Sequence, residues 1–230
     1  LSAPILNDVV ISNNVSSSAG GGIYGDIPGE FRFNRVLIAN NRSTTYGGGG
    51  VFLWYTTRNG GVMENVTIIG NNAIGENGAI CVIAPQAGEG VPGGQAVLTL
   101  VNAIIRDNNE PTFMVNGYNE ERMSRLSISY SDIENGRDAI FSRNEFVEIE
   151  WGEGNIDEDP LFVDPDAGDY QLTEDSPCID AGDPESGPDP DETRADMGAY
   201  YFFQDPELIP RRLNVPDEYE TIQAAIDASD

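Results

Sequence analysis

The chain has 230 residues and a formal net charge of −27, from 39 acidic and 12 basic side chains. The basic side chains are all arginine, and the sequence holds neither lysine nor histidine. Without histidine it cannot build a Ser-His or Cys-His nucleophile or an imidazole metal site. The negative charge argues against nucleic acid or an anionic membrane surface as a partner, since both require a basic face.

Three further features limit the class of protein. The longest apolar stretch is about seven residues, too short for membrane insertion. The chain begins at Leu1 without a basic-then-apolar leader, so we expect a processed product or an excised piece. The two cysteines, Cys81 and Cys178, lie among apolar or small residues and are interpreted as buried thiols, not a disulfide framework.

One octet recurs through the first two thirds of the chain, with an asparagine at its start, aliphatic residues in its middle and an Asn-Asn pair at its end. Its copies are 7–14, 34–41, 65–72 and 102–109, with a weaker fifth copy at 129–136. A second shared element, in which small residues precede an aliphatic one, follows the first three copies. The apolar runs are short and lack helical periodicity, so each copy predicts strands separated by turns.

A repeat of about 30 residues with several short strands cannot bury its own apolar face, whereas stacked repeats can. Each strand would then pair in parallel with its counterpart about 4.8 Å further on. Residues 1–150 are therefore predicted to form an all-β solenoid of about five coils, a rod about 20–25 Å long.

The repeated asparagines have a mechanical interpretation in this geometry. Asparagine tolerates the left-handed backbone of a turn, and stacked turns let each amide donate to the next. We expect such a structural ladder to contain Asn13, Asn40, Asn71, Asn108 and Asn135. A row that binds sugars or ions is the alternative.

These residues carry a family resemblance. Residues 1–144 resemble the right-handed parallel β-helix repeats of the pectate-lyase-like superfamily, in particular those of bacterial and archaeal surface proteins. The Asp/Pro-rich stretch 151–204 contains Asp-Pro-Leu-Phe-Val-Asp at 159–164, Ser-Pro-Cys-Ile-Asp-Ala-Gly-Asp-Pro at 176–184 and Arg-Ala-Asp-Met-Gly-Ala-Tyr-Tyr at 194–201. It is similar to the choice-of-anchor-type closing segment of such proteins, which implies an extracellular or cell-surface location in a prokaryote.

The end of the chain holds a predicted linker at 205–214 and a predicted helix at 215–230. One face of that helix is apolar, with Tyr219, Ile222, Ala225 and Ile226. The pattern resembles a helix that covers the N-terminal end of a β-helix, although here it closes the chain. It would either cover coil 1–25 of the next copy, giving a head-to-tail filament, or open the next tandem domain of a longer protein.

The carboxylates concentrate after the repeats. Asp164, Asp166 and Asp169 surround a glycine-containing turn, as oxygen ligands do in flexible Ca²⁺ loops. A second and weaker candidate is the trio Asp189, Asp191 and Asp196. Neither trio completes an EF-hand pattern, and a solvated acidic loop is the alternative to a calcium site.

The resemblance also raises carbohydrate-active enzymes, namely polysaccharide lyases and glycoside hydrolases. A glycosidase needs two carboxylates flanking a cleft, but within the repeats the acids are sparse and form no repeated pair. A strongly negative surface would also repel polyuronate substrates. The sequence therefore favours a non-catalytic extracellular structural protein, with copies of itself, tandem domains or surface glycans as partners. The alternative is a carbohydrate-active β-helix enzyme or a glycan-binding module.

Overall fold

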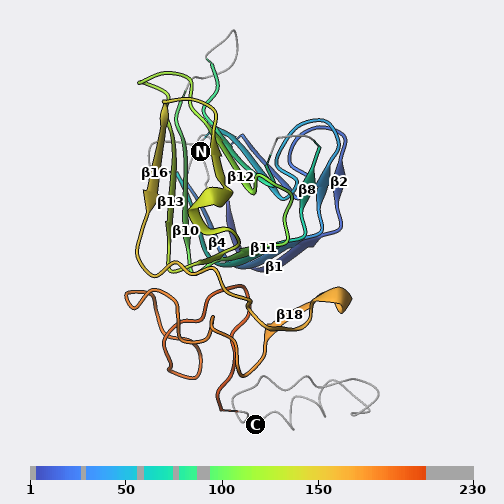
Figure 1. Cartoon of the computed structure of the whole chain (residues 1–230), viewed down its shortest axis with the longest axis vertical. Coiled ribbons are helices and arrows are strands. Elements are labelled where there is room, and N and C mark those ends of the chain that lie inside the picture. The colour runs from blue at the N-terminus through green and yellow to red at the C-terminus, as the bar shows by residue number, and fades with distance from the viewer. Residues whose placement is uncertain (1–3, 27–29, 56–59, 75–77, 87–93, 206–230) are drawn as a thin grey trace.

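The structure is a computed structural model of the chain, and it describes residues 4–26, 30–55, 60–74, 78–86 and 94–205. Coils of strands lie over one another, and an irregular segment lies along one side of them (Figure 1). Strands of successive coils pair in parallel, so the chain forms a right-handed parallel β-helix. The predicted all-β fold is confirmed.

The largest sheet crosses every coil. In spatial order it contains β1 (Ile5–Ser12), β4 (Phe31–Ala39), β7 (Gly61–Ile69), β10 (Ala96–Val101), β13 (Ser124–Ser129) and β16 (Val147–Trp151). In the fourth and fifth coils the strand is divided, and its second part forms β11 (Ile104–Arg106) and β14 (Asp132–Ile133). The division falls beside Asn102 and Tyr130, whose backbones are left-handed, with φ of 53° and 47°.

Two smaller sheets complete the wall of the solenoid. The second sheet contains β3 (Ile23–Asp26), β6 (Val51–Tyr55), β9 (Ile80–Ile83), β12 (Phe113–Asn116) and β15 (Ile140–Ser142). The third contains β2 (Val15–Ser16), β5 (Arg42–Ser43) and β8 (Asn72–Ala73). A 3-10 helix, η1 (Gly136–Ala139), stands in the fifth coil before β15.

The register stacks like side chains on like. Val9 pairs with Val36 and Val36 with Val66, so a column of valines points into the core. The two deeper valines are fully buried, as are most of the side chains that fill the interior from β4 to β13. Burial of such aliphatic columns provides the main stabilisation, because each coil covers the apolar face of its neighbour.

The asparagine ladder exists, but it contains Asn14, Asn41, Asn71 and Asn108. Each side-chain Nδ2 donates to the Oδ1 of the next asparagine, at 3.0, 3.0 and 3.1 Å. The backbone N–H of each donor residue also donates to that oxygen, at 3.0, 3.0 and 2.9 Å. Asn71 and Asn108 therefore belong to the ladder as predicted.

The assignment of Asn13, Asn40 and Asn135 to the ladder was wrong. They lie in a different column, in which the backbone is left-handed with φ of 58°, 57° and 64°. The error is one of register: the sequence repeat aligns Asn34 with Asn65, whereas the sheet pairs Asn34 with Glu64. The ladder asparagine is thus the second of the Asn-Asn pair in coils 1 and 2 and the first in coils 3 and 4.

The closing segment lies along the flank of the coils (Figure 1). Its regular elements are β17 (Phe162–Asp164), η2 (Pro165–Ala167) and β18 (Asp169–Leu172). Tyr170 and Ala199 pack on Leu37 and Ile69, while further along Met197 packs on Ile104 of β11. The predicted boundary at residue 150 falls inside β16.

Both cysteines are free and buried, as predicted. The predicted linker at 205–214 lies, apart from Asp205, outside the described residues. The predicted helix at 215–230, with Tyr219, Ile222, Ala225 and Ile226, lies wholly outside them.

Candidate functional site

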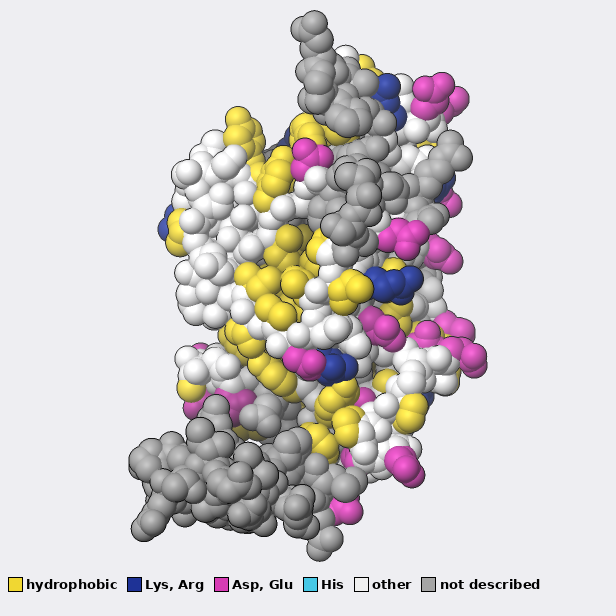
Figure 2. Space-filling view, turned by 180° about the vertical axis from the view of Figure 1, so that it is seen from behind, with side chains coloured by type: hydrophobic (Ala, Val, Ile, Leu, Met, Phe, Trp, Pro, Cys, Tyr) yellow, Lys and Arg dark blue, Asp and Glu magenta, His cyan; other side chains and the backbone are white. Residues whose placement is uncertain are grey.

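The first coil presents an apolar face at one end of the solenoid. Leu6, Val9, Ile11 and Ile23 of this coil are only partly buried, although the side chains stacked on them in the second coil are 0–3% exposed. Strands β1 and β3 each stand at the end of their sheet among the described residues. Figure 2 looks onto this face, and apolar side chains gather near its centre.

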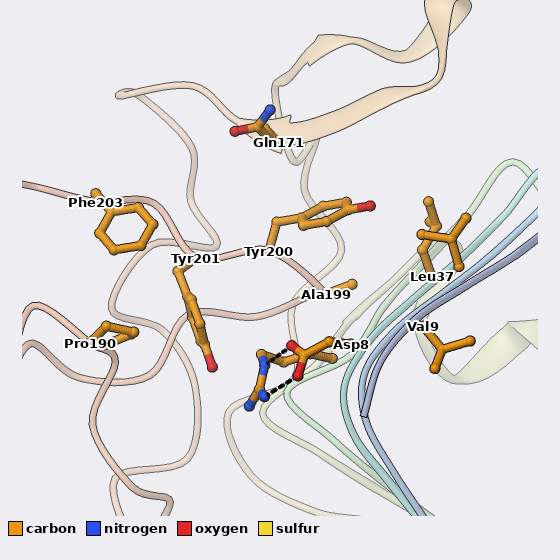
Figure 3. A pocket seen from close by; sticks show the side chains of 11 residues that line it. Asp8, Val9, Leu37, Gln171, Pro190, Ala199, Tyr200, Tyr201 and Phe203 are labelled. Atoms are coloured by element: carbon orange, nitrogen blue, oxygen red, sulfur yellow. Dashed lines mark hydrogen bonds and ion pairs between the residues drawn. The ribbon is translucent and has the colours of Figure 1, made fainter. Parts of the chain in front are cut away.

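A cavity of about 400 Å³ lies beside this face, between the coils and the closing segment. Figure 3 shows the side chains around it. From β1 and β4 it is lined by Asp8, Val9, Val10, Arg35 and Leu37, and from the closing segment by Gln171, Pro190, Ala199, Tyr200, Tyr201 and Phe203. We call it the aromatic cavity.

A bidentate ion pair forms the floor of the aromatic cavity. Arg35 donates from Nε to Oδ1 of Asp8 at 2.5 Å and from Nη2 to Oδ2 at 2.7 Å. The hydrogen bond from Arg35 lowers the pKa of Asp8, and Asp8 in turn raises the pKa of Arg35. The Arg35 guanidinium also lies 5.7 Å from the ring centre of Tyr201. Both side chains therefore stay ionised, and Asp8 is a poor candidate for a general acid.

A second cavity, of about 760 Å³, is lined by three carboxylates, those of Glu110, Asp138 and Asp157. Asp157 accepts a hydrogen bond from Arg106 at 3.1 Å, and Glu110 accepts one from Asn135 at 3.5 Å. We call this second cavity the acidic cavity. A glycosidase needs two carboxylates that face each other across a cleft, so the enzyme alternative stays a prediction for this cavity.

The proposed calcium ligands Asp164, Asp166 and Asp169 lie in and beside η2. Asp164 accepts from the backbone N–H of Ala167 at 3.1 Å, and Asp169 accepts from that of Gln171 at 3.1 Å. Across the described ranges, no three acidic or cysteine side chains converge in a way that could hold a metal ion. Calcium binding at this loop stays a prediction.

The second trio does come together, but around backbone groups. Asp189 accepts from the N–H of Asp196 at 2.8 Å, and Asp196 accepts from those of Asp180 and Phe202 at 2.8 and 2.7 Å. Asp191 accepts from Gln204 N–H at 2.9 Å. Burial raises the pKa of Asp189 to about 7 and that of Asp196 to about 6.

One further carboxyl group lies where the coils meet the closing segment. Asp132 is fully buried and accepts from Arg106 and from the N–H of Glu158, both at 3.1 Å. The Cys178 thiol lies 3.8 Å from its other oxygen. Burial raises the pKa of Asp132 to about 6 despite the neighbouring arginine.

A family model described as the Chlamydia polymorphic membrane protein (Chlamydia_PMP) repeat matches residues 8–26. The matched segment is part of the first coil, and the match together with the stacked parallel strands indicates a repeat protein of the β-helix type. No curated protein and no solved structure matches the chain. In the described part of the chain, no helix has the length and apolar character that a membrane crossing needs.

Sequence reasoning missed both cavities. The aromatic cavity joins Asp8–Val10 to Tyr200–Phe203, which are about 190 residues apart in the sequence. The one available signal is the run of aromatic residues at 200–203, which follows the last acidic motif. The acidic cavity joins two coils and the start of the closing segment, and its carboxylates follow no repeat.

Proposed function

We propose that this protein is a non-catalytic structural protein of a prokaryotic cell surface. It joins end to end with copies of itself, or with adjacent tandem β-helix domains, to form an elongated rod. The observation that carries the proposal is the apolar face of the first coil, where core side chains are only partly buried and β1 and β3 end their sheets among the described residues. Such an edge invites strand pairing or a cap. The matched repeat family is that of a polymorphic membrane protein, which supports a surface location.

The joint is assigned to residues 215–230 of the neighbouring unit. The sequence gives this segment an apolar face of Tyr219, Ile222, Ala225 and Ile226, which suits the apolar face of the first coil. A contact between two different surfaces of identical units does not close on itself, so it produces a filament. In a tandem protein the same contact would join successive domains.

Negative-stain microscopy and light scattering on the purified chain test this assembly. The full chain should form rods whose length increases with protein concentration, and deletion of 215–230 should leave single units. Ile222→Asp should act like the deletion, whereas Ala224→Asp, on the opposite face of the predicted helix, should leave the rods intact. If rods still form at unchanged length after the deletion, this segment is not the joint. A full chain that stays monomeric at every concentration rejects the filament.

The acidic cavity favours a second candidate function, a carbohydrate-active enzyme. Glu110, Asp138 and Asp157 come from three separate parts of the chain and surround one open space. Incubation with neutral and acidic polysaccharides, followed by an assay for new reducing ends or unsaturated products, tests it. Product formation that is lost in Asp138→Asn would establish the enzyme, and its absence with every substrate would reject it.

A further inference from the structure

Within the described residues, the closing segment covers the second coil beside the aromatic cavity and leaves the first coil uncovered there. Val10 and Leu37 are stacked partners on the outer face of the large sheet. Leu37 is 5% exposed because the closing segment covers it, whereas Val10 is 57% exposed. The result is a step whose floor is the first coil and whose wall is the stretch Ala199–Phe203.

The wall of the step is aromatic. Tyr200, Tyr201 and Phe203 line the cavity, and the rings of Tyr201 and Phe203 meet edge to face with centres 6.3 Å apart. Aromatic side chains combine a broad apolar surface with, in tyrosine, a polar tip. This combination suits a ligand that has apolar C–H faces and polar edges at the same time.

The polar groups of the cavity are planar and keep unused hydrogen-bonding capacity. A carboxylate offers about four acceptor positions, and Arg35 occupies two of those on Asp8. The Gln171 amide, at the opposite side of the cavity in Figure 3, adds donors and an acceptor. Burial raises the pKa of Tyr200 and of Tyr201, so both phenols stay protonated and can donate.

The charges of the cavity cancel, which is unusual in a chain of net charge −27. Among its lining side chains Asp8 and Arg35 carry the only charges, and they neutralise each other. An anionic ligand would meet the repulsion of the whole molecule, and a cationic one would find no free carboxylate. A neutral ligand is not repelled by the net charge and does not need a free carboxylate.

We infer that the aromatic cavity is a binding site for a neutral glycan, with a sugar ring against Tyr201 and its hydroxyls on Asp8, Arg35 and Gln171. A cavity of about 400 Å³ is within the range of small-ligand sites, which are mostly apolar with a few placed polar groups. The site contains one carboxylate whose pKa is lowered, so it binds without cleaving. The inference goes beyond the proposed rod and does not depend on how the rod assembles.

Calorimetric titration of the full chain with cellotetraose, mannotetraose and xylotetraose tests the site, with tetragalacturonate as the acidic comparison. We expect one neutral tetrasaccharide to bind, and Tyr201→Ala to weaken it by at least about tenfold, which corresponds to 1.4 kcal/mol. Gln171→Ala, at an exposed position, should weaken binding without affecting the fold. Tyr24→Ala, which changes an exposed tyrosine on β3, is the matched control and should bind normally.

Three results would overturn the inference. One is that no neutral tetrasaccharide binds at millimolar concentration, and another is that tetragalacturonate binds more tightly than all of them. The third is sugar binding that Tyr201→Ala and Gln171→Ala leave unchanged. If Tyr201→Ala instead shortens the rods while no sugar binds, the cavity is a contact between copies of the chain.

Discussion

The coils and the closing segment both satisfy the backbone N–H groups of their turns, but they do so with different side chains. In the coils, turn N–H groups are satisfied by asparagine amides, which donate and accept in one continuous row from Asn14 to Asn108. In the closing segment they are satisfied by aspartate carboxylates, as at Asp164, Asp189 and Asp196. An amide both donates and accepts, whereas a carboxylate only accepts. The first can therefore propagate from coil to coil, and the second can only cap a turn.

This difference gives the acidity of the chain a structural cause. Aspartates such as Asp159, Asp169, Asp183 and Asp191 each accept the N–H two residues further on. These are Asx turns, which hold an irregular chain in shape without strands or helices. These four aspartates thus have a structural role in the turns of the closing segment.

The two regions meet at Arg106, and its removal should have the largest effect. This side chain joins the buried Asp132 of β14 to Asp157 of the closing segment, at 3.1 Å in both cases. Arg106→Ala leaves Asp132 without its cationic partner, so we expect a loss of about 3–5 kcal/mol in the free energy of unfolding. Urea denaturation at pH 8 measures it.

Two comparisons separate this effect from a general loss of charge. Arg125→Ala breaks the exposed ion pair with Glu148 and should cost at most about 1 kcal/mol. Adding Asp132→Asn to Arg106→Ala should restore part of the lost stability, because the uncompensated charge is gone. Equal losses for the two arginine variants would mean that the two regions are not joined through this pair.

Within the coils, Asn71→Ala should have the next largest effect. Asn71 is 1% exposed, and its amide donates to Asn108 and to the backbone oxygens of Ile38 and Ile69. Its loss leaves buried groups unsatisfied, so we expect about 2–3 kcal/mol of destabilisation in denaturant titrations. Asn14→Ala, at the exposed end of the ladder, is the control and should cost less than about 1 kcal/mol. If both variants lose the same free energy of unfolding, the buried part of the ladder does not stabilise the coils more than its exposed end does.

The coils could be predicted from the sequence because their contacts repeat. The spacing of the octets predicts stacked parallel strands, since each residue meets its own counterpart one unit on. Register was predictable only to within one residue, because Asn34 and Asn65 match as letters while the buried valines Val36 and Val66 determine the pairing. The Asn-Asn pairs alone do not indicate which asparagine of each pair joins the ladder.

No repeat in the sequence predicts how the closing segment packs on the flank of the coils, and none predicts the aromatic cavity. Tyr170 reaches Asn40, and Ala199 reaches Thr67, over sequence separations of 130 and 132 residues. Contacts of this kind are fixed by shape complementarity between an irregular chain and the outer face of a sheet. No periodic pattern marks them, so neither the cavity nor its position beside coil 1 could be inferred.

The stability of the closing segment should also depend on pH, through its own buried carboxyl groups. Burial raises the folded-state pKa of Asp189 to about 7 and of Asp196 to about 6, above the value of about 3.9 for an aspartate in an unfolded chain. Groups with raised pKa stabilise the fold fully below their unfolded pKa and lose that contribution as pH rises through the folded value. The stability of the closing segment should therefore fall between about pH 4 and 7, from the unfolded to the folded pKa, as shown by amide exchange near Asp180 and Phe202.

Asp189→Asn tests the origin of this pH dependence. It keeps an oxygen that can accept the N–H of Asp196 and removes the charge, so the decline with pH should become shallower. Asp166→Asn removes the same charge from an exposed position and is the control. Should the two substitutions flatten the profile equally, the pH effect arises from net charge and not from the buried cluster.

The smallest expected effect is at Asp164, where the capping and calcium interpretations can be separated. Asp164 accepts the N–H of Ala167 at the start of η2, so Asp164→Ala should cost about 1 kcal/mol in local stability, as faster exchange of that amide. Asp166→Ala, with no capping bond of this kind to lose, should leave the exchange unchanged. If the loop binds calcium, millimolar Ca²⁺ should raise the melting temperature, and Asp164→Ala combined with Asp166→Ala should abolish the rise. No shift with Ca²⁺, together with the local loss in Asp164→Ala, would assign this aspartate to turn capping, as in the rest of the closing segment.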